Sequence, residues 1–195
     1  MPNVANLINQ FNQMSTVNNG LTWGQVSNMR VGGNRVGLAF KYARIVRLPV
    51  GMEVYKFNGF PNLRTDHWGH VTPWWSPYLS YDVDPGWNAK VNMARTLGNI
   101  SVRELGRVTS AVSEDWNSCA WLVVIRLRVP INVAYGGFAQ QPRNHGGASR
   151  VDNSGQKHEG RGASANLPGG GRQFFIPNLE PRHFTVTQSR SLLNM

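Results

Sequence analysis

Blocks of apolar residues along the chain predict several strands. The strongest block covers residues 120–129, and its unbroken apolar first half is typical of a strand buried on both faces. Its second half places Arg126 and Arg128 on one face, because side chains alternate along a strand. Further strand-like runs lie at 50–58, 173–177 and 182–188.

Apolar residues at helical spacing predict helices between and before these strands. One helix covers 87–97, directly after a turn at 84–86. A second begins at Ser101, which forms a capping-box pattern with Glu104. A short amphipathic helix is predicted over 3–14. The inward-facing residues are Val91, Ala94 and Leu97 in the first helix and Leu105, Val108 and Val112 in the second.

Turn-forming residues divide the rest of the chain. The pair Trp74-Trp75 lies between Pro73 and Pro77, which predicts a short edge strand or a tight turn, because proline donates no hydrogen bond to a sheet. Residues 31–50 are predicted as extended structure broken by a turn, and 58–70 as a loop. Two helices in the middle of the chain with several β-segments around them indicate an α+β protein.

The chain is long enough for one domain with a sizeable core. We predict an N-terminal helical and extended segment over 1–44 that packs on a body formed by 45–195. Within that body, 143–172 is rich in glycine and poor in apolar residues. A stretch of this length without its own secondary structure is typical of a functional or disordered loop.

Charge points to an anionic partner. The 20 Lys and Arg residues outnumber the 10 Asp and Glu residues, which gives a formal net charge of +10. Sixteen of the basic residues are Arg, whose planar guanidinium binds phosphate and carboxylate groups in a bidentate manner. A nucleotide, a nucleic acid and an acidic protein surface all fit this charge.

Several classes of protein are not supported by the sequence. The single cysteine, Cys119, excludes an internal disulfide and a cysteine-based zinc cluster, and we expect it to be a buried thiol. No apolar run is long enough to cross a membrane, and residues 1–11 show no signal-peptide pattern. Neither a phosphate-binding loop of the Walker type nor a serine-hydrolase elbow is present.

Individual motifs leave alternatives open. His67 and His70 have metal-ligand spacing, but they lie in a predicted loop without a further ligand, so we expect no metal site. Lys56 lies within a predicted strand, either reaching solvent or meeting an anion. The Trp74-Trp75 pair is either part of the core or a platform for a planar ring such as nicotinamide.

Four segments nevertheless occur in an order that is typical of one enzyme family. They are Val54-Tyr55-Lys56-Phe57-Asn58, Val71-Thr72-Pro73-Trp74-Trp75-Ser76, the central strand leading to Gly136-Gly137, and Gly169-Gly170-Gly171-Arg172-Gln173-Phe174-Phe175-Ile176-Pro177-Asn178. Over residues 45–180 this order resembles the ADP-ribosyltransferase domain of bacterial toxins. It is closest to the domain at the C-terminus of polymorphic (Rhs-type) secreted toxins.

The resemblance implies two packed, mostly antiparallel β-sheets with flanking helices and an NAD cleft between them. It assigns NAD binding to the residues that match the family motifs. The matching positions are Lys56 with its neighbours Tyr55 and Asn58, the pocket residues Thr72, Trp74, Trp75 and Ser76, and Gln173 on the last strand. Lys56, Ser76 and Gln173 are the expected catalytic residues, and NAD is the co-substrate.

Two positions depart from the family pattern. Lys56 stands where most members have Arg or His, and Phe175 stands where the family has a catalytic Glu. Gln173 can hydrogen-bond a ribose hydroxyl but supplies no negative charge. Glu180 and Glu159 are the nearest acids in the sequence that could supply it.

The leading expectation is therefore a secreted effector that acts in the cytoplasm of a target cell in competition between bacteria. It would transfer ADP-ribose from NAD to a translation factor, such as elongation factor Tu, or to RNA. An acidic immunity protein would protect the producing cell. An NAD hydrolase, a basic ribonuclease and a non-catalytic binding domain remain as alternatives. The ribonuclease would use the histidines at positions 67, 70, 145, 158 and 183.

Overall fold

The computed structural model describes residues 16–98, 100–112, 114, 116–142, 150–151, 157–158 and 166–193. The helix predicted over 3–14 lies outside these residues, as does most of the glycine-rich segment 143–172. His145 and Glu159 also lie outside them.

Seven strands form one antiparallel sheet, which confirms a mixed α+β protein. Their order across the sheet is β13-β6-β4-β5-β12-β7-β3. The strands are β3 (Phe40–Leu48), β4 (Glu53–Asn58), β5 (Trp74–Pro77), β6 (Trp121–Leu127), β7 (Ile131–Phe138), β12 (Arg172–Phe175) and β13 (Phe184–Ser191). The short pairs are β1 (Arg30–Val31) with β2 (Asn34–Arg35), β8 (Gln141–Pro142) with β11 (Asn166–Leu167), and β9 (Arg150–Val151) with β10 (Lys157–His158).

The sheet is continuous because β5 joins its two halves. The first residues of β5, Trp74 and Trp75, pair with β12, whereas Ser76 and Pro77 pair with β4. The two sheets expected from the resemblance are therefore two halves of one sheet. The prediction of an edge strand or turn for the Trp pair is also wrong, since β5 is the central strand. Its prolines do not interrupt the ladder because Pro73 precedes the strand and Pro77 ends it.

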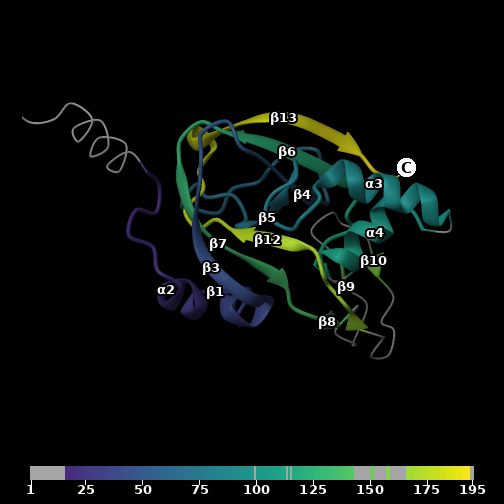
Figure 1. Ribbon diagram of the computed structural model, residues 1–195, viewed down its shortest axis with the longest axis horizontal. Coiled ribbons are helices and arrows are strands. Elements are labelled where there is room, and N and C mark those ends of the chain that lie inside the picture. Colours follow the sequence, from purple (N-terminus) through teal and green to yellow (C-terminus); the bar gives the residue numbers. More distant parts are fainter. Residues whose placement is uncertain are drawn as a thin grey trace, which may run out of the picture.

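Apolar residues of one face connect the two halves. Leu48, Val133 and Phe174 from the β3-β7-β12 half share one buried cluster with Val54 and Ile125 from the other half. The cluster is continuous across these strands, and Figure 1 shows the sheet curving from β13 and β6 towards β7 and β3. We call this clustered face the inner face and the opposite one the outer face.

Helices cover the outer face in two groups. Helices α3 (Trp87–Leu97) and α4 (Val102–Thr109) cover the β4-β6-β13 half, while α2 (Trp23–Asn28) and the 3₁₀ helix η1 (Val36–Ala39) cover the other half. The prediction of a helix over 87–97 is confirmed. The prediction that Leu97 faces inward is wrong. The helix ends there, at the left-handed Gly98, and Leu97 remains 58% exposed.

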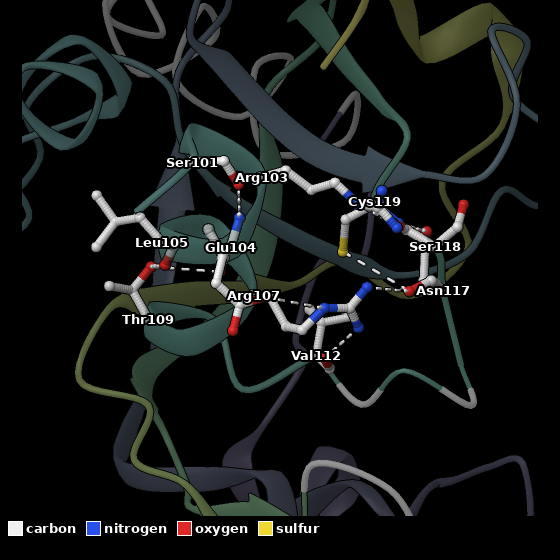
Figure 2. Close-up of polar contacts among 11 residues, drawn as sticks. Ser101, Arg103, Glu104, Leu105, Arg107, Thr109, Val112, Asn117, Ser118 and Cys119 are labelled. Atoms are coloured by element: carbon white, nitrogen blue, oxygen red, sulfur yellow. Dashed lines mark hydrogen bonds and ion pairs between the residues drawn. The ribbon is translucent and has the colours of Figure 1, made fainter. Parts of the chain in front are cut away.

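A buried arginine, Arg107, holds the loop between α4 and β6 (Figure 2). Ser101 caps α4 by accepting a hydrogen bond from the Glu104 N–H, as predicted. Further along α4, the Arg107 guanidinium is buried and donates to the carbonyl oxygens of Val112 and Asn117. Cys119, at the end of this loop, is a fully buried thiol, as expected. Arg107 thus serves the fold rather than an external anion.

Candidate functional site

Lys56 lies on the inner face of β4, two residues after the core residue Val54. Its ammonium contacts the Thr72 hydroxyl. It also lies 5.4 Å from the centre of the Trp75 ring, in a cation–π arrangement. We call Lys56, Thr72 and Trp75 the Lys56 site. The structure therefore brings together three of the residues predicted to bind NAD, from two different segments.

The electrostatics of the Lys56 site favour an anionic or oxygen-rich ligand. Burial lowers the pKa of Lys56 from 10.5 to about 8, because desolvation disfavours its charged form. In the described part of the chain, no ion pair compensates this ammonium. The buried Nε1 of Trp75 also has no hydrogen-bond partner there. The Lys56 ammonium and the Thr72 hydroxyl both offer protons, so they fit phosphate or ribose oxygens.

The lowered pKa of Lys56 predicts a pH-dependent stability. Between about pH 8 and 10.5 the unfolded chain binds more protons at this residue than the folded chain, so the free energy of unfolding rises with pH. Lys56→Met removes this contribution. In urea unfolding, we expect the wild type to gain stability relative to Lys56→Met between pH 7.5 and pH 10. The exposed Lys41→Met is the control, and parallel pH curves for wild type and Lys56→Met would contradict the expectation.

The other predicted NAD-binding residues lie elsewhere. Trp74 is on the outer face, where its ring packs against Phe175 and Phe40. Gln173 is also on that face, is buried, and donates from its amide to the carbonyl oxygen of Ala39. This bond ties β12 to η1. The structure thus places Gln173 on the face opposite Lys56.

Asn58, Tyr55 and Ser76 complete the predicted set. The Asn58 side chain donates to the carbonyl oxygens of Phe60 and Asn62 and holds the loop after β4. Tyr55 and Ser76 face each other across β4 and β5 on the outer face, where their hydroxyls hydrogen-bond. Neither residue is therefore part of the Lys56 site.

Tyr55 and Ser76 instead border a buried ion pair. The Lys90 ammonium lies 2.9 Å from the Asp84 carboxylate, and the two side chains are only 9% and 1% exposed. Lys90 also donates to the Tyr55 hydroxyl at 3.4 Å. We call Tyr55, Ser76, Asp84 and Lys90 the Asp84 cluster. It lies on the outer face where β12 and β5 diverge, since Asp84 also accepts from the Arg172 N–H at 3.1 Å.

Burial and charge act against each other in the Asp84 cluster. Burial raises the pKa of Tyr55 despite the nearby ammonium. Burial opposes the charge of Lys90, but its interactions with Tyr55 and Asp84 outweigh that effect and raise the pKa of Lys90. The carboxylate of Asp84 further accepts from the Gly86 N–H at the start of α3. The pair thereby fixes α3 against β12.

The sequence analysis missed the Asp84 cluster, although a signal for it exists. Lys90 follows Trp87 by three residues and precedes Ala94 by four, so it shares their apolar helix face. A lysine within an apolar face needs a buried partner. Asp84, six residues earlier, is that partner.

Two histidines from distant segments come together. His70 lies 3.9 Å from Asp66 in the loop after β4, and His183 ends the 3₁₀ helix η2 (Pro181–His183). The backbones on either side are joined by a hydrogen bond from the Val71 N–H to the Leu179 carbonyl. Burial lowers the pKa of His183, the Glu180 carboxylate opposes this, and Arg182 and, to a smaller extent, His70 lower the pKa further.

His67 and His70 have the spacing of metal ligands, so the side chains around them decide whether they form a metal site. His67 stacks on Trp68, 3.5 Å between ring centres. Among the described residues, no group of three His, Cys, Asp or Glu side chains is arranged to hold a metal ion. Nor is any described helix both long enough and apolar enough to cross a membrane.

Comparison with known proteins adds no family to this geometry. No protein-family model matches the chain, and no curated protein is significantly similar to it.

Proposed function

We propose that this protein is an NAD-dependent mono-ADP-ribosyltransferase toxin. One observation carries the proposal: the three segments that match the family motifs lie on adjacent strands. Lys56 is on β4, Trp75 on β5 and Gln173 on β12, and these are neighbours in the centre of the sheet. Lys56 also contacts the second segment directly, through Thr72 and Trp75.

In the proposed reaction, the bond between the nicotinamide nitrogen and ribose C1′ breaks. Nicotinamide leaves with the bonding electron pair, and a nucleophile of the target forms a new bond to C1′ and loses its proton. Nicotinamide is a good leaving group on a cationic ring, so the protein mainly has to position the reactants and exclude water. This requirement suits a site made of donors and an aromatic ring.

Each residue of the Lys56 site has a proposed role. The Lys56 ammonium neutralises the NAD diphosphate, and binding of that anion favours its protonated form. The Thr72 hydroxyl, which is exposed, hydrogen-bonds the same part of the ligand. The Trp75 ring packs against the Lys56 ammonium and helps to position it. Gln173 acts as a positioning residue that fixes β12, because its amide is already bonded to Ala39.

Among the residues that the structure describes, no unpaired carboxylate near Gln173 could supply the negative charge that the family obtains from Glu. Asp84 is anchored to the N–H of Arg172, but Lys90 already neutralises it. Glu180 pairs with Arg182 at 3.0 Å, at the start of η2. We therefore propose that catalysis rests on positioning and on the Lys56 site rather than on a carboxylate beside the ribose.

The test is incubation of the protein with labelled NAD and a bacterial lysate. We expect a labelled macromolecule and released nicotinamide. Lys56→Met should lower the rate by about a hundredfold, as loss of one donor to a developing or bound charge does. Thr72→Val should lower it less, and the exposed Arg95→Gln is the control for loss of one positive charge.

The outcomes separate the alternatives. Nicotinamide without a labelled macromolecule would identify an NAD hydrolase. A protein that is toxic to cells but consumes no NAD would contradict the proposal. If Lys56→Met reacts at the wild-type rate, the transferase proposal stands, but the Lys56 site is not the place of the reaction.

The proximity of His70 and His183 favours a ribonuclease as the second candidate. Two imidazoles supply the general acid and the general base that RNA cleavage needs. Here we expect RNA cleavage that is lost in His70→Asn and in His183→Asn, while Lys56→Met cleaves normally.

As a toxin, the proposed transferase would act in the cytoplasm of a target cell. The producing cell would then need an immunity protein, and a chain of net charge +10 favours an acidic one.

A further inference from the structure

One edge of the sheet is uniformly basic. The first 52 residues contain no Asp or Glu, and all five of their basic residues are exposed. These residues are Arg30, Arg35, Lys41, Arg44 and Arg47. Three of them lie on β3, the edge strand, and two on the β1–β2 hairpin beside it (Figure 1). The edge therefore presents positive charge along its length.

An aromatic side chain projects from the middle of this edge. The Tyr42 side chain is 94% exposed, so its ring is open to solvent.

 The φ value of Tyr42 is +54°, which is rare for a residue with a side chain. Tyr42 lies at a break in the β3–β7 register, between Lys41 and Arg44. Such bulges redirect side chains, and strained backbone is concentrated at functional positions.

The combination of an exposed ring and flanking cations points to a specific kind of ligand. Aromatic rings stack on bases, and Lys and Arg bind the phosphates between them. A duplex would hide its bases from Tyr42, so the ligand must be single-stranded. A protein partner would need an apolar interface core, whereas only Leu38 and Tyr42 are large exposed apolar side chains on the described segment 28–48.

We propose that the β3 edge, formed by Arg30, Arg35, Lys41, Tyr42, Arg44 and Arg47, binds single-stranded RNA. Arg44 is paired with Asp82 at 3.4 Å, but both side chains are solvent-exposed. Exposed pairs of this kind are weak, so a phosphate can replace the carboxylate. The inference rests on the proposed function in one respect, because it selects RNA as the target class of the transferase.

The test measures RNA binding to the full chain in the absence of NAD. The probe is a fluorescein-labelled 20-nucleotide uridine RNA, followed by anisotropy over a range of NaCl concentrations. Tyr42→Gly removes the ring and relieves the positive φ, so it should fold normally and bind roughly tenfold or more weakly. Tyr42→Phe keeps the ring and should bind like the wild type.

Charge is tested with two matched triple variants. Lys41→Gln/Arg44→Gln/Arg47→Gln should reduce the slope of log affinity against log salt by about 2, because single strands lose about 0.7 per phosphate contact. Arg95→Gln/Arg128→Gln/Arg182→Gln removes the same charge from exposed positions elsewhere and should leave the slope nearly unchanged.

Three results would overturn the inference. The first is equal binding by wild type and Tyr42→Gly, and the second is an equal loss of salt dependence in the two triple variants. Competition by polyglutamate as strong as that by unlabelled RNA would also overturn it in favour of an acidic protein. The binding assay contains no NAD, so the two proposals are tested separately. A protein that binds RNA but does not turn over NAD would contradict only the proposed transferase. A protein that turns over NAD but does not bind RNA would contradict only this inference.

Discussion

Asp84→Asn is expected to lower the free energy of unfolding by about 3–5 kcal/mol. The substitution leaves the Lys90 ammonium buried without its counter-charge, next to the Tyr55 hydroxyl. It also weakens the hydrogen bonds that Asp84 accepts from Gly86 and Arg172, which hold α3 and β12 together. Urea unfolding followed by tryptophan fluorescence measures the change.

The double variant Asp84→Asn/Lys90→Met separates the ion pair from its geometry. It removes both charges, so it should be more stable than Asp84→Asn alone, as expected when an unpaired buried charge causes the loss. Asp82→Asn is the matched control, because Asp82 pairs with Arg44 at the surface and should contribute less than about 1 kcal/mol. Equal effects of Asp84→Asn and Asp82→Asn would refute a stabilising role for the cluster.

Phe174→Ala is expected to cost about 3–5 kcal/mol of stability. Phe174 is 0% exposed on β12, and its ring centre lies 5.1 Å from that of Tyr135 and 5.2 Å from that of Tyr81. Its removal leaves a cavity in the cluster that connects the two halves of the sheet. Thermal and urea unfolding measure the loss.

A graded series checks this explanation. Phe174→Leu keeps most of the buried volume and should be less destabilising than Phe174→Ala. Leu97→Ala is the control, because Leu97 is exposed and its truncation should change stability by less than about 0.5 kcal/mol. A loss in Phe174→Ala no larger than that in Leu97→Ala would mean that Phe174 does not hold the halves together.

Local signals in the sequence predicted individual elements well. The helix over 87–97 has the predicted bounds, and Ser101 caps the next helix, because both depend on neighbouring residues. The apolar run before Arg126 is a strand buried on both faces. Such features are decided within a few residues of chain.

The candidate site was predicted only in part, for a physical reason. The segments containing Lys56, Thr72 and Trp75 were identified, and the structure brings those three side chains together. Their neighbours Tyr55 and Ser76 were assigned to the same site but face the opposite side of the sheet. Strand alternation separates adjacent side chains, and a motif read as a string of letters does not show the face on which each one lies.

By itself, the sequence determined the α+β class, the two central helices, the buried strand and the excess of positive charge. Tertiary structure decided that Trp74 and Trp75 lie in the central strand, that Lys90 is paired with Asp84, and that the basic residues of β3 lie along one edge. The reason is that helix caps and periodicity act between near neighbours in the chain. Strand order and buried ion pairs depend instead on contacts between distant segments, which form only when the whole sheet is assembled.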